Sequence, residues 1–278
     1  MNFRQYDEET LKHLHDLELM ILKEFIKICE ENNLNYYMYA GSLLGTIRHK
    51  GFIPWDDDLD VIMFREDFEK FKKIFPTLNN PKYDLLSNEI NEDYFFFFAK
   101  LMLRNTKFEE KWNEELNLHV GINIDIFVLD DMSNNKFSRK IQIWRAFFYN
   151  PLLVSSALKL DNSPFYKKFI SHMLYYILKL FNLNTSKLMK KSLRFLKKYS
   201  NKNSEYVFDI SAMLNEYPLL FRKSDFGKGE KVDFEDIKVN VPENYEEILT
   251  TLYGDYMQLP PEEKRYNHMA EHIDFGKY

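Results

Sequence analysis

The chain of 278 residues is 45% hydrophobic and 17% aromatic, which suits one large or two small folded domains and excludes an intrinsically disordered protein. Its net charge of −5 excludes a chain that is basic throughout. Its single cysteine, Cys29, excludes an internal disulfide and predicts a small buried residue on a helix. The polar first residues do not resemble a secretory signal, and no run of about 18 apolar residues predicts a membrane-spanning helix. We therefore expect a cytoplasmic protein.

The first half of the chain alternates helix and strand patterns. Residues 8–32 carry apolar residues at helical steps, and residues 65–75 form an amphipathic helical pattern that Pro76 ends. This alternation predicts an α/β or α+β fold with a mixed sheet. Buried strands are predicted at 35–40, 59–64, 83–87, 94–103 and 121–130, and a short helix or turn at 43–49.

The chain changes character after residue 131. Residues 132–204 hold 15 Lys and Arg but one acid, Asp161, so a strongly basic segment lies inside an acidic protein. Its periodicity from 134 to 199 is helical. Beyond it we predict a strand at 237–241, a helix at 242–253 with Gly254 just past its end, and an extended loop at 259–278.

Four aspartates lie within five residues at the start of a predicted strand: Asp56, Asp57, Asp58 and Asp60. Carboxylates beside an apolar run are costly unless they are solvated, paired or bound to a cation. In a strand, residues i and i+2 share a face, so Asp58 and Asp60 are expected to point the same way. A hard cation such as Mg²⁺ would relieve their repulsion, although such a cluster taken alone is more often a solvated turn.

Two further features strengthen the metal interpretation. Asp125 lies in the apolar run INIDIF and completes a three-carboxylate site if its strand neighbours the first; taken alone, an ion-paired core residue is an equal alternative. Gly41 and Ser42 lie at a strand-to-helix transition, where backbone N–H groups can approach a phosphate. Together these residues predict a site for a metal ion and a phosphate group.

The stretch YYMYAGSLLGTIRHKGFIPWDDDLDVIMF closely resembles the LicD family of phosphocholine transferases, which are related to fukutin and fukutin-related protein. The likeness returns at INIDIFVLD and at LYGDYMQLPPEEKRYNH, in the order of the family, whereas residues 132–204 carry no motif that matches. The resemblance implies a nucleotidyltransferase fold of the DNA polymerase beta type.

The resemblance also implies a reaction and its residues. Phosphocholine would pass from CDP-choline to a sugar hydroxyl of a cell-surface glycan (teichoic acid, lipopolysaccharide or a lipid-linked precursor), and CMP would be released. Gly41 and Ser42 match the phosphate-contacting turn of the family, and Asp58, Asp60 and Asp125 match its metal-binding acids. We assign these three acids to catalysis and Mg²⁺ binding, with Mn²⁺ as an alternative, and we expect Asp125 to accept the proton of the attacking hydroxyl.

Other residues near the matched motifs are candidates for binding substrate. Arg48 and Lys100 are candidates for the diphosphate, although Lys100 could instead pair with one of the aspartates. Weaker candidates for contact with the substrate are Trp55, Asp56, His49 and His268; an aromatic ring such as that of Trp55 could hold the quaternary ammonium of choline.

On this basis we divide the chain into a catalytic core at 1–131, a basic helical insertion at 132–204 and a C-terminal part at 205–278 that completes the catalytic domain. The basic stretch at 165–200 has three interpretations: an interfacial helix on anionic lipid, a helical subdomain packed on the acidic core, or a nucleic-acid surface. The first would place the enzyme on the inner face of the plasma membrane.

Several alternatives share the predicted site. CDP-ribitol, CDP-glycerol or CDP-ethanolamine could replace CDP-choline as the donor. A nucleic-acid enzyme or binding protein of the same fold is disfavoured by the acidic net charge. A non-catalytic scaffold is disfavoured by the intact set of acids, Asp58, Asp60 and Asp125.

Overall fold

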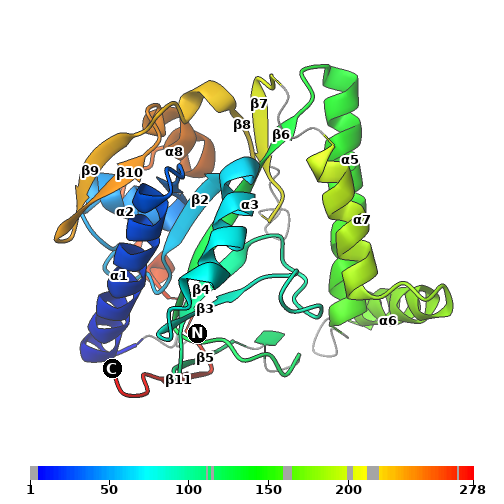
Figure 1. Cartoon of the computed structure of the whole chain (residues 1–278), viewed down its shortest axis with the longest axis horizontal. Coiled ribbons are helices and arrows are strands. Elements are labelled where there is room, and N and C mark those ends of the chain that lie inside the picture. Colours follow the sequence, from blue (N-terminus) through cyan, green and yellow to red (C-terminus); the bar gives the residue numbers. More distant parts are fainter. Residues whose placement is uncertain are drawn as a thin grey trace.

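The computed structural model describes residues 6–110, 112–113, 116–158, 165–198, 203–211, 219–267 and 269–278. A mixed sheet forms its centre and helices pack around it (Figure 1). The predicted α/β architecture with a mixed sheet is thereby confirmed. In order across the sheet, the strands are β1 (Tyr37–Met38), β2 (Asp60–Phe64), β6 (Asn123–Met132), β4 (Ala99–Leu103) and β3 (Tyr83–Leu86), and the second half of β6 also pairs with β7 (Tyr206–Asp209), which pairs with β8 (Leu219–Arg222).

The parallel pair β2 and β6 lies at the centre of the sheet, and each strand contains a run of buried apolar residues. Val61, Ile62, Ile124 and Ile126 are fully buried, as expected for strands that are covered on both faces. The strand predicted at 94–103 is shorter than expected. Residues 94–98 leave the sheet because Tyr94 and its neighbours pack into an aromatic cluster that includes Trp112.

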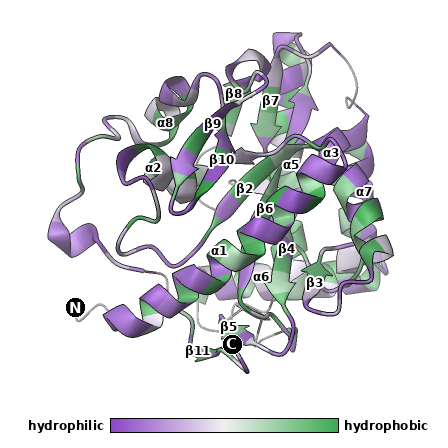
Figure 2. Cartoon of the chain, turned by 60° about the vertical axis from the view of Figure 1, so that its left-hand side comes forward, coloured by the Kyte–Doolittle hydropathy of each residue, from purple (hydrophilic) through white to green (hydrophobic). Residues whose placement is uncertain are grey.

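Two amphipathic helices pack on this sheet. Helix α1 (Glu8–Glu31) begins where the Asp7 carboxylate accepts a hydrogen bond from the Thr10 N–H, and it packs against β4 and β6. Helix α3 (Arg65–Ile74) packs against β2 and β6 and continues into the 3₁₀ turn η1 (Phe75–Leu78). Figure 2 shows hydrophilic and hydrophobic bands alternating along α1. Cys29 is buried on α1, as predicted.

The remaining elements correct several predicted boundaries. Helix α2 (Ala40–Arg48) starts before the predicted residue 43 and so includes the Gly-Ser pair, and β1 covers only part of 35–40. The tail is not wholly extended loop, because β11 (His272–Asp274) pairs with β5 (Lys107–Glu109). Other elements are the hairpin β9 (Glu230–Phe234) and β10 (Ile237–Val241), helix α8 (Tyr245–Tyr253), and the 3₁₀ turns η3 (Lys223–Asp225) and η4 (Glu262–Lys264).

The basic segment is helical, as predicted. Helices α5 (Lys136–Ala157), α6 (Phe165–Leu180) and α7 (Thr185–Lys197) follow β6 and precede β7. They pack on one end of the sheet through a second hydrophobic cluster. It joins Leu153, Leu178 and Leu193 of the helices to Met132 of β6 and Phe208 of β7. In Figure 1 they stand to the right of the sheet, with α6 projecting away from it. Within the described part of the chain, no helix is long and apolar enough to cross a membrane.

Candidate active site

Three ionisable residues form a row across the centre of the sheet. Asp60 on β2 is paired with Asp125 on β6, and Asp125 is paired with Lys100 on β4. Because directly paired residues in adjacent strands project from the same face, all three side chains lie together. The strands that carry the two acids are therefore neighbours, as the predicted site requires.

The row has more negative charge than its lysine neutralises. The Lys100 ammonium donates to the Asp125 carboxylate at 2.7 Å and to the Asn123 side-chain oxygen at 3.1 Å. Burial raises the pKa of Asp125 to about 6, although the Lys100 charge opposes that rise. Burial, and then the charges of Asp58, Asp125 and Asp56, hold the pKa of Asp60 well above its usual range. A further cation would therefore be stabilised here.

The aspartates before β2 do not share one role. Asp58 precedes β2, which begins at Asp60 and not at the predicted residue 59. Its charge nevertheless acts on Asp60, which places it near the row. Asp57 is buried and its carboxylate accepts a hydrogen bond from the Met269 N–H at 2.8 Å, so it fastens the C-terminal tail to this loop.

Gly41 and Ser42 lie in the first turn of α2, beside the acids. A Cβ atom on Gly41 would lie 2.6 Å from an oxygen of the Asp56 carboxylate, so the glycine leaves room for that carboxylate at the start of the helix. The Ser42 hydroxyl accepts a hydrogen bond from the Asp60 N–H at 2.7 Å and joins α2 to β2. A helix start favours negative charge, so this turn suits the phosphate group that the sequence predicted.

The oxygen atoms that these aspartates offer are suitable ligands for a hard divalent cation. Carboxylate oxygens from Asp58, Asp60 and Asp125 are the ligands that Mg²⁺ prefers, and the mutual repulsion of these acids is what a cation would relieve. In the described residues, no group of three His, Cys, Asp or Glu side chains is arranged closely enough to hold a metal ion. The acids are thus gathered at one place without being in coordination geometry.

The C-terminal motif returns to this region. Arg48 donates to the Tyr256 carbonyl at 2.8 Å and to the His49 ring at 3.0 Å, so much of its donor capacity is used within the protein. The Arg265 guanidinium lies 5.2 Å from the centre of the Trp55 ring. The ring centres of His49 and Trp55 are 6.1 Å apart, so the predicted candidates Arg48, His49 and Trp55 lie together. His268 lies outside the described residues.

Two residues near the acids were not among the predicted site residues. Loss of solvation around the Tyr253 hydroxyl raises its pKa, and the charges of Asp60, Asp56 and Asp58 raise it further. The hydroxyl therefore lies near these carboxylates, although the residue as a whole is 44% exposed. Arg265 lies against Trp55, as described above. Both Tyr253 and Arg265 belong to the stretch LYGDYMQLPPEEKRYNH, and the resemblance of this stretch to the family could have indicated them as site residues.

Glu18 on α1 is a further buried acid near this site. Its side chain is 2% exposed, and among the described residues its Oε2 atom has no hydrogen-bond partner. Burial holds the pKa of Glu18 well above its usual range, and the charges of Asp58, Asp57, Asp56 and Asp125 raise it further. The sequence contained a signal, because Glu18 lies four residues after Leu14 on the buried side of the helix.

We expect Glu18→Gln to stabilise the metal-free protein at pH 8 by about 1–3 kcal/mol. The folded protein keeps the Glu18 proton to a higher pH than the unfolded chain does, so this carboxyl lowers stability as pH rises above its usual value of 4.5. Chemical unfolding at pH 5 and pH 8 measures the effect, which should be larger at pH 8. The control is Asp16→Asn, an exposed change on α1. Equal effects at both pH values would contradict a buried, protonated Glu18.

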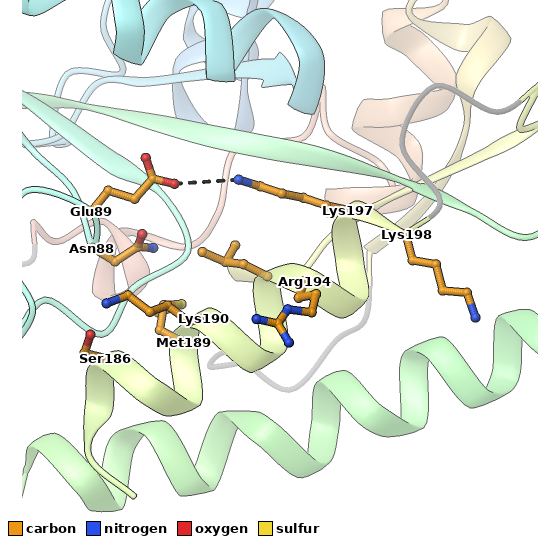
Figure 3. Close-up of a pocket in the computed structure, with 9 residues that line it drawn as sticks. Asn88, Glu89, Ser186, Met189, Lys190, Arg194, Lys197 and Lys198 are labelled. Atoms are coloured by element: carbon orange, nitrogen blue, oxygen red, sulfur yellow. Dashed lines mark ion pairs between the residues drawn. The ribbon is translucent and has the colours of Figure 1, made fainter.

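A groove of about 900 Å³ lies elsewhere, between α7 and the loop after β3 (Figure 3). Its lining includes Glu89, Lys190, Arg194 and Lys197, and Lys197 pairs with Glu89 at 3.6 Å. None of the predicted site residues lines it. The groove therefore belongs to the contact between the basic helices and the sheet domain.

Comparison with known proteins supports the resemblance. A family model described as "LicD/FKTN/FKRP, nucleotidyltransferase domain" matches residues 33–127. The chain is 29% identical to the lipopolysaccharide cholinephosphotransferase LicD of Haemophilus influenzae over 272 residues, which cover 93% of this chain and 96% of the relative. It is also 37% identical over 70 residues to an uncharacterized protein of Rickettsia typhi, a match that covers 25% of this chain and 23% of that protein.

Proposed function

We propose that this enzyme transfers phosphocholine from CDP-choline to a glycan hydroxyl and releases CMP, because residues 33–127 match the nucleotidyltransferase domain of the LicD/FKTN/FKRP family. The observation that carries the proposal is the row of Asp60, Asp125 and Lys100 beside the Gly41 turn of α2. The relative that aligns over most of the chain is a lipopolysaccharide cholinephosphotransferase, so a lipopolysaccharide glycan is the first acceptor to test, ahead of teichoic acid. A sheet core of the DNA polymerase beta type is part of this proposal.

The reaction is a displacement at the phosphorus atom that carries choline. The oxygen of the acceptor hydroxyl forms a new bond to this phosphorus, and the bond from phosphorus to the bridging oxygen of the diphosphate breaks. CMP leaves with the electron pair of that bond. The hydroxyl proton passes to a carboxylate, for which we propose Asp125, because it is paired with Asp60 in the register of the central strands and lies beside Lys100.

The other residues bind and orient the donor. The start of α2 at Gly41 and Ser42 would receive one phosphate of CDP-choline, and the Lys100 ammonium would stabilise negative charge next to Asp125. Asp58, Asp60 and Asp125 would hold Mg²⁺, or Mn²⁺ in its place, which when bound supplies neutralisation of the diphosphate charge. The ring of Trp55, beside His49 and Arg265, is our candidate for contact with choline.

The donor can be identified by its effect on thermal stability. We expect CDP-choline with Mg²⁺ to raise the melting temperature, because a ligand at 100 times its Kd adds about 2.7 kcal/mol of stability. CDP-ethanolamine, CDP-ribitol, CDP-glycerol and ATP are the comparison ligands, and Asp58→Ala is the control that should abolish the Mg²⁺-dependent shift. A shift for another CDP compound alone would contradict the choline assignment. No shift for any of the five would contradict the transferase proposal.

A further inference from the structure

Helix α6 exposes apolar side chains around most of its circumference. Of the α6 side chains that the structure describes, only Ser171 and Leu178 are buried. We define the α6 face as its exposed large apolar residues together with the adjoining Phe181. They are Phe165, Tyr166, Phe169, Ile170, Met173, Tyr176, Ile177, Leu180 and Phe181, and their exposed fractions run from 43% to 84%.

The α6 face is not a typical soluble surface. A surface helix normally directs its apolar stripe toward the core, and contiguous exposed apolar patches mark sites of interaction. Helix α5 adds a second exposed stripe, because Phe137, Ile141, Trp144 and Phe148 follow one another at steps of 4, 3 and 4 and are all exposed. These two stripes together therefore mark a site of interaction with something other than the described part of this chain.

Helix α7 behaves in the opposite way. Leu188, Met189 and Leu193 are buried beneath it. Its lysines pair with acids of the sheet domain: Lys190 lies 3.3 Å from Glu92, and Lys197 lies 3.0 Å from Glu69. Figures 1 and 3 show the position of α7 beside this domain. The predicted basic stretch thus has two parts: α7 packs on the acidic core, and α6 projects away from it.

The charge around the α6 face favours an anionic partner. Residues 132–204 contain 15 Lys and Arg and one acid, and Lys136, Lys140 and Lys179 are exposed on α5 and α6. Two copies of this chain that met through this segment would bring like charges together. Aromatic and aliphatic side chains flanked by lysines suit the interface between lipid headgroups and acyl chains, where the lysines contact anionic headgroups.

We propose that the α6 face binds an anionic lipid bilayer, with α6 lying in the plane of the interface. A helix of 16 residues is too short to span a bilayer, which agrees with the finding that no described helix can cross one. The cytoplasmic leaflet of the plasma membrane carries anionic lipid, so the enzyme would bind the inner face of this membrane. The surface is separate from Asp60 and Asp125, and it would hold the active site near an acceptor glycan carried on lipid.

Vesicle flotation tests the proposal without depending on catalysis. The full-length protein is mixed with phosphatidylcholine vesicles that contain or lack phosphatidylglycerol. We expect binding to the anionic vesicles at low salt, weaker binding at high salt, and at least a roughly tenfold loss of binding in Phe169→Asp with Leu180→Asp. The matched control, Leu78→Asp with Ile90→Asp, places the same charges on exposed apolar residues elsewhere and should bind as the wild type does.

Three outcomes would overturn the proposal. The first is no flotation of the wild-type protein with anionic vesicles at low salt. The second is equal binding by the α6 variant and the wild type. The third is a wild-type dimer that does not bind vesicles and that the α6 variant converts to a monomer in light scattering, which would assign the face to a second copy. CMP release with a soluble acceptor should be unchanged in the α6 variant, so failure of this proposal is distinguishable from failure of the transferase proposal.

Discussion

Asp125→Asn should lower the rate of phosphocholine transfer by roughly 10²–10⁴-fold. Asparagine keeps the size of the side chain but cannot accept the hydroxyl proton. Because it is neutral, it also binds a cation more weakly than the aspartate carboxylate does. The change also removes the 2.7 Å ion pair between Asp125 and the buried Lys100 ammonium. The hydrogen bond from Lys100 to the Asn123 side-chain oxygen remains. CMP release measured under saturating CDP-choline and Mg²⁺ gives kcat, and CDP-choline titration gives binding.

Two controls separate catalysis from folding in this experiment. Asp131→Asn makes the same chemical change on the same strand, where Asp131 pairs with Lys223 at 2.8 Å, and it should retain activity. The melting temperature of Asp125→Asn shows how much of its loss is structural. If Asp125→Asn binds CDP-choline and keeps near wild-type kcat, Asp125 is not the base.

Arg65→Met should lower the free energy of unfolding by about 3–5 kcal/mol. The Arg65 guanidinium at the start of α3 donates to both carboxylate oxygens of Asp130 on β6, at 2.8 and 2.7 Å, and both side chains are buried. Removal of the arginine leaves the Asp130 carboxylate in the core without its partner, which is more costly than the loss of an exposed ion pair. Urea unfolding monitored by circular dichroism measures the change.

The matched control for the buried pair is Arg104→Met. Arg104 pairs with Asp84 on the surface, where both side chains are about half exposed, and its removal should cost about 0–1 kcal/mol. The double change Arg65→Met with Asp130→Leu should recover much of the lost stability, because no unpaired charge is then buried. An Arg65→Met protein within 1 kcal/mol of the wild type would contradict this account of how α3 is held on the sheet.

The centre of the fold could be predicted from the sequence because its signals are local. Apolar runs identified β2 and β6, and the acids Asp60 and Asp125 in these runs were the reason for predicting a site on the two strands. The sequence could not give the register that pairs Asp60 with Asp125, since register depends on contacts between distant segments. It did show that Lys100 requires an anion, and the partner is Asp125.

Other features escaped prediction for identifiable physical reasons. Strand β11 forms because it pairs with β5. A strand of three residues is too short to show an alternation of apolar and polar residues in the sequence. Glu18 was not predicted as a site residue, because the helical pattern places it on the buried side of α1 but cannot show which groups it faces there. The aromatic run at 94–98 resembled a strand, but its rings pack with Trp112 outside the sheet.

The most direct test of the central claim is to analyse the reaction products of the wild-type enzyme. The enzyme is incubated with CDP-choline, Mg²⁺ and a lipopolysaccharide acceptor. We predict that the glycan gains one phosphocholine for each CMP released, and that chelation of the metal stops both. Consumption of CDP-choline without phosphocholine on the glycan, or transfer that continues unchanged after chelation, would contradict the account.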